Sequence, residues 1–237
     1  MATASGSKTT YGIYAYVEYT VTHSETTTTL TVSAAQVKTS TANVGVNGTA
    51  GTFAGTGQTT KSNNSWKMRS SATVNVFSAF SWSWNRGTAA SSASISFSIT
   101  FDGHTSTASF SVAIPARTAY TISYNANGGS GSASQTKWYG INIALNNGSG
   151  FSRPNHTLTG WNTNAAGTGT HYNLGATYSG NAGLSLFAEW ELNAIEVPLK
   201  VSGTIKRGVL YTKVNNQIKI PYVGFVKVNN TWKQIKI

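Results

Sequence analysis

Long runs of alternating apolar and small polar residues constrain the fold of this chain more than any other feature. The run ISFSITF places Ile95, Phe97, Ile99 and Phe101 at every second position, with Ser or Thr between them. Successive side chains of a β-strand point to opposite faces of the sheet, so the pattern indicates strands with one buried and one solvated face. No segment shows sustained helical periodicity. The sequence therefore predicts an all-β protein.

Residues 1–116 carry most of these runs and are predicted to form an immunoglobulin-like β-sandwich. Asp102-Gly103 is predicted to be a two-residue hairpin turn, because both residues tolerate positive φ. Pro115 ends strand pairing and marks the boundary. The positions predicted to face inward are Tyr11, Ile13, Ala15, Val17, Tyr19, Val21, Leu30, Val32, Ala34, Ala108, Phe110, Val112 and Ile114.

The composition excludes several kinds of chemistry. The chain has no cysteine, which rules out disulfides, thiolate catalysis and Cys-ligated metals. The start MATASGSKTTYGIY has neither a charged nor an apolar signal region, and no run approaches the ~18 apolar residues of a membrane helix. We expect a protein that is made in a cytoplasm, has no membrane partner and reaches the exterior by a route other than ordinary secretion.

Residues 117–193 form a second predicted unit, a small β-module. Asn127-Gly128-Gly129 indicates a turn that needs positive φ. Trp161 and Trp190 are spaced to supply most of the core of a domain of this size.

This second unit resembles the Listeria–Bacteroides repeat, also called the internalin B-repeat type. The resemblance lies in YTISYNANGG (120–129), SRPNHTLTGWNTNAAGTGTHYNLGATY (152–178) and LSLFAEW (184–190). Asn155, His156 and Leu158 depart from it, since the family usually has Gly, Tyr and Phe there. The resemblance implies a β-grasp-like module without enzymatic activity, of a type found in Gram-positive surface proteins and tailed-phage virion proteins. The matching positions are Tyr120, Ile122, Tyr124, Asn125, Asn127, Gly128, Gly129, Arg153, Thr157, Gly160, Trp161, Tyr172, Gly175, Leu186, Phe187, Ala188 and Trp190.

Residues 194–237 are a basic, duplicated tail. YTKVNNQIK is echoed fourteen residues later by FVKVNNTWK, and eight of the 17 basic residues lie here with one of the six acids. Each VNN indicates a hairpin turn, which would place Lys213 opposite Ile218 and Lys227 opposite Trp232, where a cation–π contact is available. The ending VKVNNTWK resembles the C-termini of structural proteins of phages that infect Gram-positive bacteria.

No catalytic constellation, metal site or cofactor site is predicted. Glu189 and Glu191 share one strand and are expected on its solvated face, whereas a glycosidase needs carboxylates opposed across a cleft. His156 and His171 could approach each other, but no third metal ligand accompanies them.

Several aromatic and basic residues are candidates for surface or ligand contacts. In NVFSAFSWSWNRG, an aromatic row could stack on sugar rings or form the inner face of the sandwich; we favour core for Phe80 and Trp82 and leave Trp84 open. Snorkelling lysines around rim aromatics would give the same pattern with no ligand. The candidate contacts are Trp66, Trp84, Arg86, Trp138, Tyr139, Lys213, Lys227, Trp232 and Lys233.

Three non-enzymatic functions fit these observations. The first is a structural component of a tailed-phage virion, in the tail tip, fibre, collar or capsid decoration, which is released by lysis. The second is a bacterial cell-surface adhesin, and the third is a stand-alone carbohydrate- or nucleic-acid-binding module. The expected partners are other virion proteins, further copies of the chain, and a host cell-wall glycan or teichoic acid. Nucleic acid is not expected, because the lysines alternate along strands instead of lining a groove.

Overall fold

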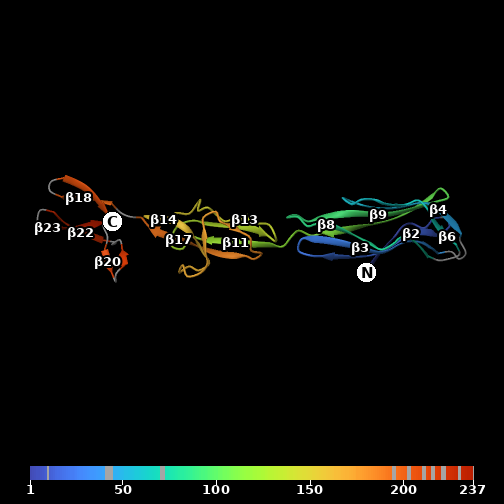
Figure 1. The fold of residues 1–237 in the computed structure, drawn as a ribbon, viewed down its shortest axis with the longest axis horizontal. Helices are drawn as coiled ribbons and strands as arrows, with labels where there is room; N and C mark the ends of the chain where they lie inside the picture. Colours follow the sequence, from blue (N-terminus) through green and yellow to red (C-terminus); the bar gives the residue numbers. More distant parts are fainter. Residues whose placement is uncertain are drawn as a thin grey trace. The chain divides into compact units, whose positions relative to one another are not determined.

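A computed structural model of the chain describes residues 1–9, 11–40, 45–69 and 73–193 with their side chains. Beyond them it describes the backbone of 196–201, 204–209, 212–214, 217–219, 223–228 and 231–236. The regular secondary structure of these residues consists of β-strands alone, which confirms the all-β prediction (Figure 1). The chain divides into two compact units, Met1–Ala119 with Trp138–Gly140, and Tyr120–Lys137 with Ile141–Ile237.

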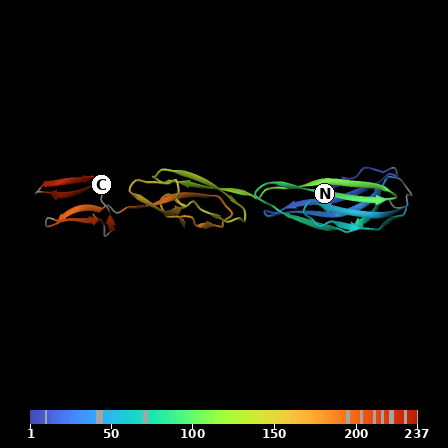
Figure 2. The same ribbon diagram turned by 90° about the horizontal axis from the view of Figure 1, so that it is seen from above.

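The first unit contains two five-stranded sheets that face each other across one hydrophobic core (Figure 2). The first sheet has the order β1-β2-β3-β7, and β8 also pairs with β3. The second has the order β10-β9-β4-β5, and β6 also pairs with β4. The immunoglobulin-like assignment of this sandwich stays a prediction. The strands are β1 (Ala2–Ser5), β2 (Ile13–His23), β3 (Thr27–Thr39), β7 (Thr73–Phe77), β8 (Phe80–Asn85), β10 (His104–Ile114), β9 (Ser91–Phe101), β4 (Val46–Gly55), β5 (Lys61–Asn63) and β6 (Trp66–Met68).

The alternating pattern builds this core as predicted along most of its length. Phe97, Ile99 and Phe101 of β9 are fully buried. Phe53 lies at the centre, with its ring centroid 5.0 Å from that of Phe80 and 5.7 Å from that of Phe97. These aromatic contacts join strands from both sheets, so they hold the two layers together.

Two local irregularities depart from simple alternation. A register shift in the β2–β3 pairing, where Glu18 pairs with Ala34 and the next residue pairs with Val32, leaves Ser33 without an opposite residue. Beyond this bulge the inward-facing core residues of β3 are Ala35 and Val37. The prediction that Tyr11 faces inward is wrong, because β2 begins only at Ile13 and Tyr11 is half exposed.

The turn between β9 and β10 is the predicted two-residue hairpin. Asp102 has φ 42° and Gly103 has φ 75°, and β9 and β10 pair in register up to Phe101 and His104 on either side. Positive φ at both central residues matches the right-handed twist of the flanking strands.

Two glycines of this unit should respond differently to substitution by alanine. A Cβ on Gly48 would lie 1.8 Å from the buried Trp66 ring, whereas a Cβ on Gly103 meets nothing within 4 Å. We expect Gly48→Ala to destabilise the unit by about 3 kcal/mol through overpacking. Gly103→Ala should cost only about 1 kcal/mol, through its positive φ. Urea unfolding followed by tryptophan fluorescence measures both; equal losses would contradict the packing at Trp66.

The second unit is built on a five-stranded sheet with the order β12-β11-β17-β14-β15. Its central strands β11 and β17 run parallel, as in a β-grasp, but residues 139–155 form turns and β13 where a β-grasp carries its helix. A separate pair, β13 with β16, packs its residues into the same core. The strands are β11 (Ala119–Asn125), β12 (Ser132–Trp138), β13 (Ile143–Ala144), β14 (His156–Asn162), β15 (His171–Asn173), β16 (Thr177–Tyr178) and β17 (Leu184–Leu192).

Trp161 is the centre of this second core, as predicted. Its side chain is fully buried, its ring packs edge-on against Tyr124 and Phe151, and its indole N–H donates to the Asn146 carbonyl over 2.7 Å. Trp190 is partly buried and packs against the same cluster. The indole hydrogen bond lets a large ring be buried without leaving its polar group unsatisfied.

Beyond residue 195, the described backbone forms three antiparallel strand pairs: β18 (Glu196–Val201) with β19 (Thr204–Val209), β20 (Thr212–Val214) with β21 (Gln217–Lys219), and β22 (Val223–Val228) with β23 (Thr231–Lys236). The pairing of Lys213 with Ile218 and of Lys227 with Trp232 confirms the predicted registers. The predicted Asn turns and the cation–π contact lie outside the described residues. No helix in the described part of the chain is long and apolar enough to cross a membrane.

Candidate functional site

Trp66 belongs to the core and not to a surface patch, which corrects the sequence-based prediction. The side chain is 4% exposed and its indole N–H donates to the Ala50 carbonyl over 3.1 Å. Strand β6 has three residues and turns Trp66 and Met68 inward, so only Lys67 between them is exposed. A basic aromatic patch around Trp66 is therefore excluded.

Trp84 and Arg86 are partly buried and are held by backbone carbonyls of their own unit. The Trp84 indole N–H donates to the Thr56 carbonyl over 2.8 Å. The Arg86 guanidinium donates to Pro115 over 3.0 Å and also to the carbonyls of Ser24 and Ala116. Three of its five N–H groups are therefore occupied, and this arginine fastens the end of β8 to neighbouring segments.

The remaining predicted contacts are not brought together into a site. Trp138 and Tyr139 are both partly buried, and the Tyr139 carbonyl accepts a bond from the Arg117 guanidinium over 3.0 Å. Lys213, Lys227, Trp232 and Lys233 lie on β20, β22 and β23, whose side chains are outside the described residues. Ligand binding by these residues stays a prediction.

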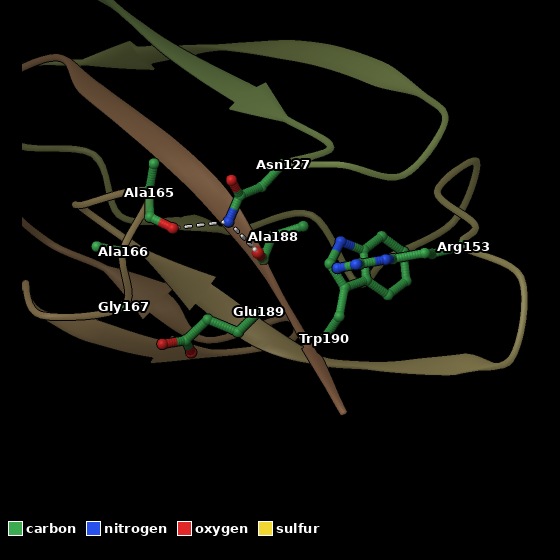
Figure 3. A pocket seen from close by; sticks show the side chains of 8 residues that line it. All are labelled: Asn127, Arg153, Ala165, Ala166, Gly167, Ala188, Glu189 and Trp190. Carbon is green, nitrogen blue, oxygen red and sulfur yellow. Dashed lines mark hydrogen bonds between the residues drawn. The ribbon is translucent and has the colours of Figure 1, made fainter. Parts of the chain in front are cut away.

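The site that the structure does assemble lies in the second unit, and Asn127 holds it together. The Asn127 backbone has φ 47°, and its N–H donates to the side-chain oxygen of Asn125 over 2.8 Å. Its side-chain amide donates to the carbonyls of Ala165 and Ala188, over 2.9 and 3.0 Å (Figure 3). One amide group thus joins the turn after β11, the loop between β14 and β15, and β17.

The two glycines after Asn127 let this turn approach its neighbours closely. Gly128 has φ 85°, which L side chains rarely adopt. A Cβ on Gly129 would lie 2.6 Å from the Ser152 carbonyl oxygen and 2.7 Å from the Trp190 ring. Trp190 in turn donates its indole N–H to the Ala126 carbonyl over 2.8 Å. The predicted positive-φ turn is confirmed, and its glycines also make room for Trp190.

The loop of residues 163–170 is shaped by the buried side chain of Asn162. Its carbonyl oxygen accepts the backbone N–H groups of Asn164 and Gly169, both over 2.9 Å. Its amide donates to the Glu189 carboxylate over 2.8 Å. Asn162 is 2% exposed, so these bonds form away from competing water.

The Glu189 side chain is 24% exposed, and unlike its exposed neighbour Glu191 it takes part in hydrogen bonds that the sequence did not predict. The Glu189 carboxylate bonds with Asn162 and with Nδ1 of His171, on the far side of β14. His171 can reach across β14 because Gly160 stands between them: a Cβ there would lie 2.4 Å from the imidazole. Glu189 is therefore part of a hydrogen-bonded network.

Both ring nitrogens of His171 face acceptor oxygens. Nε2 lies 3.0 Å from the side-chain oxygen of Asn173, and Nδ1 contacts the Glu189 carboxylate. Only the imidazolium can donate to both, so the bond to Asn173 and then that to Glu189 raise the pKa of His171 above its ordinary value. His156 lies at the other end of β14, where it pairs with Leu192, so the two histidines do not approach each other.

An open pocket of about 250 Å³ lies between the turn after β11, the loop of residues 163–170 and β17 (Figure 3). Arg153 and Trp190 line it together with Asn127 and Glu189, and the loop residues Ala165–Gly167 and Ala188 complete its wall. Within the residues that carry side chains here, no group of three or more metal-ligating side chains occurs. The resemblance places Asn127, Arg153 and Trp190 in three separate segments of the repeat, and the sequence did not predict that they share a pocket.

Residues 120–189 match the Listeria-Bacteroides repeat domain. The match confirms the resemblance that was drawn from the motifs of the second unit. The pocket residues Asn127, Arg153, Ala165–Gly167, Ala188 and Glu189 lie within the matched range, and Trp190 directly follows it, so the pocket is formed by the repeat and its next residue. No curated protein and no solved structure matches the chain.

The His171 network should make the stability of the second unit depend on pH. A histidine whose pKa is raised on folding stabilises the protein fully below its unfolded pKa, and this contribution is lost as the pH rises through the folded value. We expect His171→Gln to destabilise the unit more at about pH 5 than at about pH 8.5. A proton NMR titration should place the pKa of His171 above the ordinary histidine value, and Asn173→Ala should lower it. A pKa at or below the ordinary value would contradict the double hydrogen bond.

Proposed function

We propose that the protein is a non-enzymatic structural component of a tailed-phage virion, which displays its β-modules for assembly and host attachment. The repeat module at residues 120–189 carries the display part of this proposal, because the resemblance stated above ties such modules to surface and virion proteins. The ending VKVNNTWK supports the virion part, since similar endings occur in phage structural proteins.

A binding role suits the chemistry of the second unit better than a catalytic one. The acid–base pair of its described residues, His171 with Glu189, is also bonded to Asn173 and Asn162. A general base must be free to take a proton from a substrate within hydrogen-bond reach. Here the carboxylate already accepts from two protein donors, which supports a role in holding β15 and β17 to the intervening β14.

The proposed partners are other virion proteins, further copies of this chain, and a glycan or teichoic acid of the host wall. Small β-modules that bind sugars weakly gain avidity when many copies act together on one particle. The eight basic residues beyond position 193 would favour an acidic polymer or an acidic neighbouring protein.

A bacterial cell-surface adhesin is the second candidate. The matching family is a bacterial repeat, and such a module is compatible with a surface-associated role on the bacterium itself. Both candidates share display and binding, and they differ in whether the chain is attached to a particle or to a cell wall.

Electron microscopy with a gold-labelled antibody against the chain separates these two candidates. In a lysing culture that produces the protein, we expect labels on released particles at a constant position. Labels on the cell wall in unlysed cells would support the adhesin and contradict the virion assignment. Labels on neither, with the protein recovered only as a free monomer, would contradict both.

A further inference from the structure

The pocket of the repeat module contains a positively charged side chain whose charged group has no hydrogen-bond or ion-pair partner in the described part of the chain. Arg153 is partly buried and lines the pocket, and its guanidinium makes no hydrogen bond or ion pair with any side chain or backbone group that the structure describes. Arg86, by contrast, has its guanidinium on three carbonyls. Five N–H donors in a fixed plane are therefore available at Arg153 for an oxygen-bearing ligand.

The same pocket also contains an anionic acceptor. The Glu189 carboxylate accepts one bond on each oxygen, from Asn162 and from His171. A carboxylate has about four acceptor sites, so capacity for a ligand donor remains. No ion pair joins Arg153 and Glu189 among the described residues, which leaves the two charges separate. A ligand in this pocket can therefore accept hydrogen bonds from Arg153 and donate one to Glu189.

This charge pattern selects a neutral hydroxylated ligand over an anion. A phosphate would be attracted by Arg153 and repelled by Glu189. A hydroxyl group both accepts and donates, so neighbouring hydroxyls of one ring can bond Arg153 and Glu189 together. The remaining lining consists of Asn127, the small residues Ala165, Ala166, Gly167 and Ala188, and Trp190, whose ring is the large apolar group of the pocket. An aromatic ring packs well against the C–H face of a sugar.

We propose that this pocket binds one pyranose ring of a neutral glycan, with Arg153 and Glu189 on its hydroxyls and Trp190 against its apolar face. Its volume of about 250 Å³ is below the usual range of roughly 300–1,000 Å³ for drug-sized ligands, which suits a single ring. The inference specifies the host contact of the proposed function and rests on that function for its biological meaning, whereas binding itself can be tested on the purified chain.

The test is an NMR titration of the full, ¹⁵N-labelled chain with methyl glucoside and with the disaccharide of N-acetylglucosamine. Inorganic phosphate and glycine are titrated in parallel as an anion and a zwitterion. We expect at least one sugar to shift the indole N–H of Trp190 and the backbone N–H groups of Gly128 and Gly167. Phosphate and glycine should leave them in place.

Three variants decide whether the shifts come from this pocket. Arg153→Gln and Glu189→Gln each remove one charge and keep the side-chain size, and each should weaken sugar binding by about tenfold or more. Arg69→Gln is the matched control, because Arg69 is an exposed arginine of the first unit, and it should leave binding unchanged. Dispersed spectra of each variant verify its fold.

Absence of any sugar-induced shift, tighter binding of phosphate or glycine, or unchanged affinity in Arg153→Gln would overturn the assignment. If no sugar binds but the antibody labels released particles, the pocket assignment is wrong and the virion proposal remains supported. If a sugar binds but the antibody never labels released particles, the pocket assignment is supported and the virion proposal is wrong.

Discussion

The second unit depends on one side-chain amide. Asn127 donates to Ala165 and Ala188, so it fixes a turn, a loop and a central strand relative to one another. Its positive φ and the two following glycines give that turn a shape in which Trp190 can lie close to the backbone. Asn162 shapes the loop of residues 163–170 from within, and the bond from Asn127 to Ala165 joins that loop to the turn after β11 and to β17. The geometry of the site therefore follows from a local backbone conformation.

The first unit is held together mainly by apolar packing between its two sheets. Its two sheets are joined by apolar side chains, with Phe53 at the centre, and Arg86 fastens one end through backbone carbonyls. Aromatic packing across two sheets is close-packed and specific, so the sandwich tolerates little rearrangement. Polar side chains cover the outer faces, mostly Ser and Thr, which bond to one another across strands, as Thr29 does with Ser83. Such a unit is suited to carry a binding module.

The features that the sequence predicts well are those that depend on neighbours along the chain. The alternation around Phe97 and the turn at Asp102-Gly103 follow from strand periodicity and backbone preference. Trp66 was misplaced because a strand of three residues is too short to show its alternation. The hydrogen bonds of Glu189 are not predictable in this way, because its partner His171 lies two strands away and reaches it only across Gly160. Pairings of that kind depend on sheet order, which periodicity does not specify.

Hydrogen exchange in the variant Asn127→Asp tests the central claim most directly. The substitution keeps the size of the side chain but replaces the two-hydrogen donor with a carboxylate that faces two carbonyl oxygens. The account predicts markedly faster exchange of the backbone N–H groups of residues 164–169, while those of Phe97 and Ile99 in the first unit stay protected. Unchanged exchange throughout 164–169 would show that the loop is held by something other than Asn127, and the account of the site would be wrong.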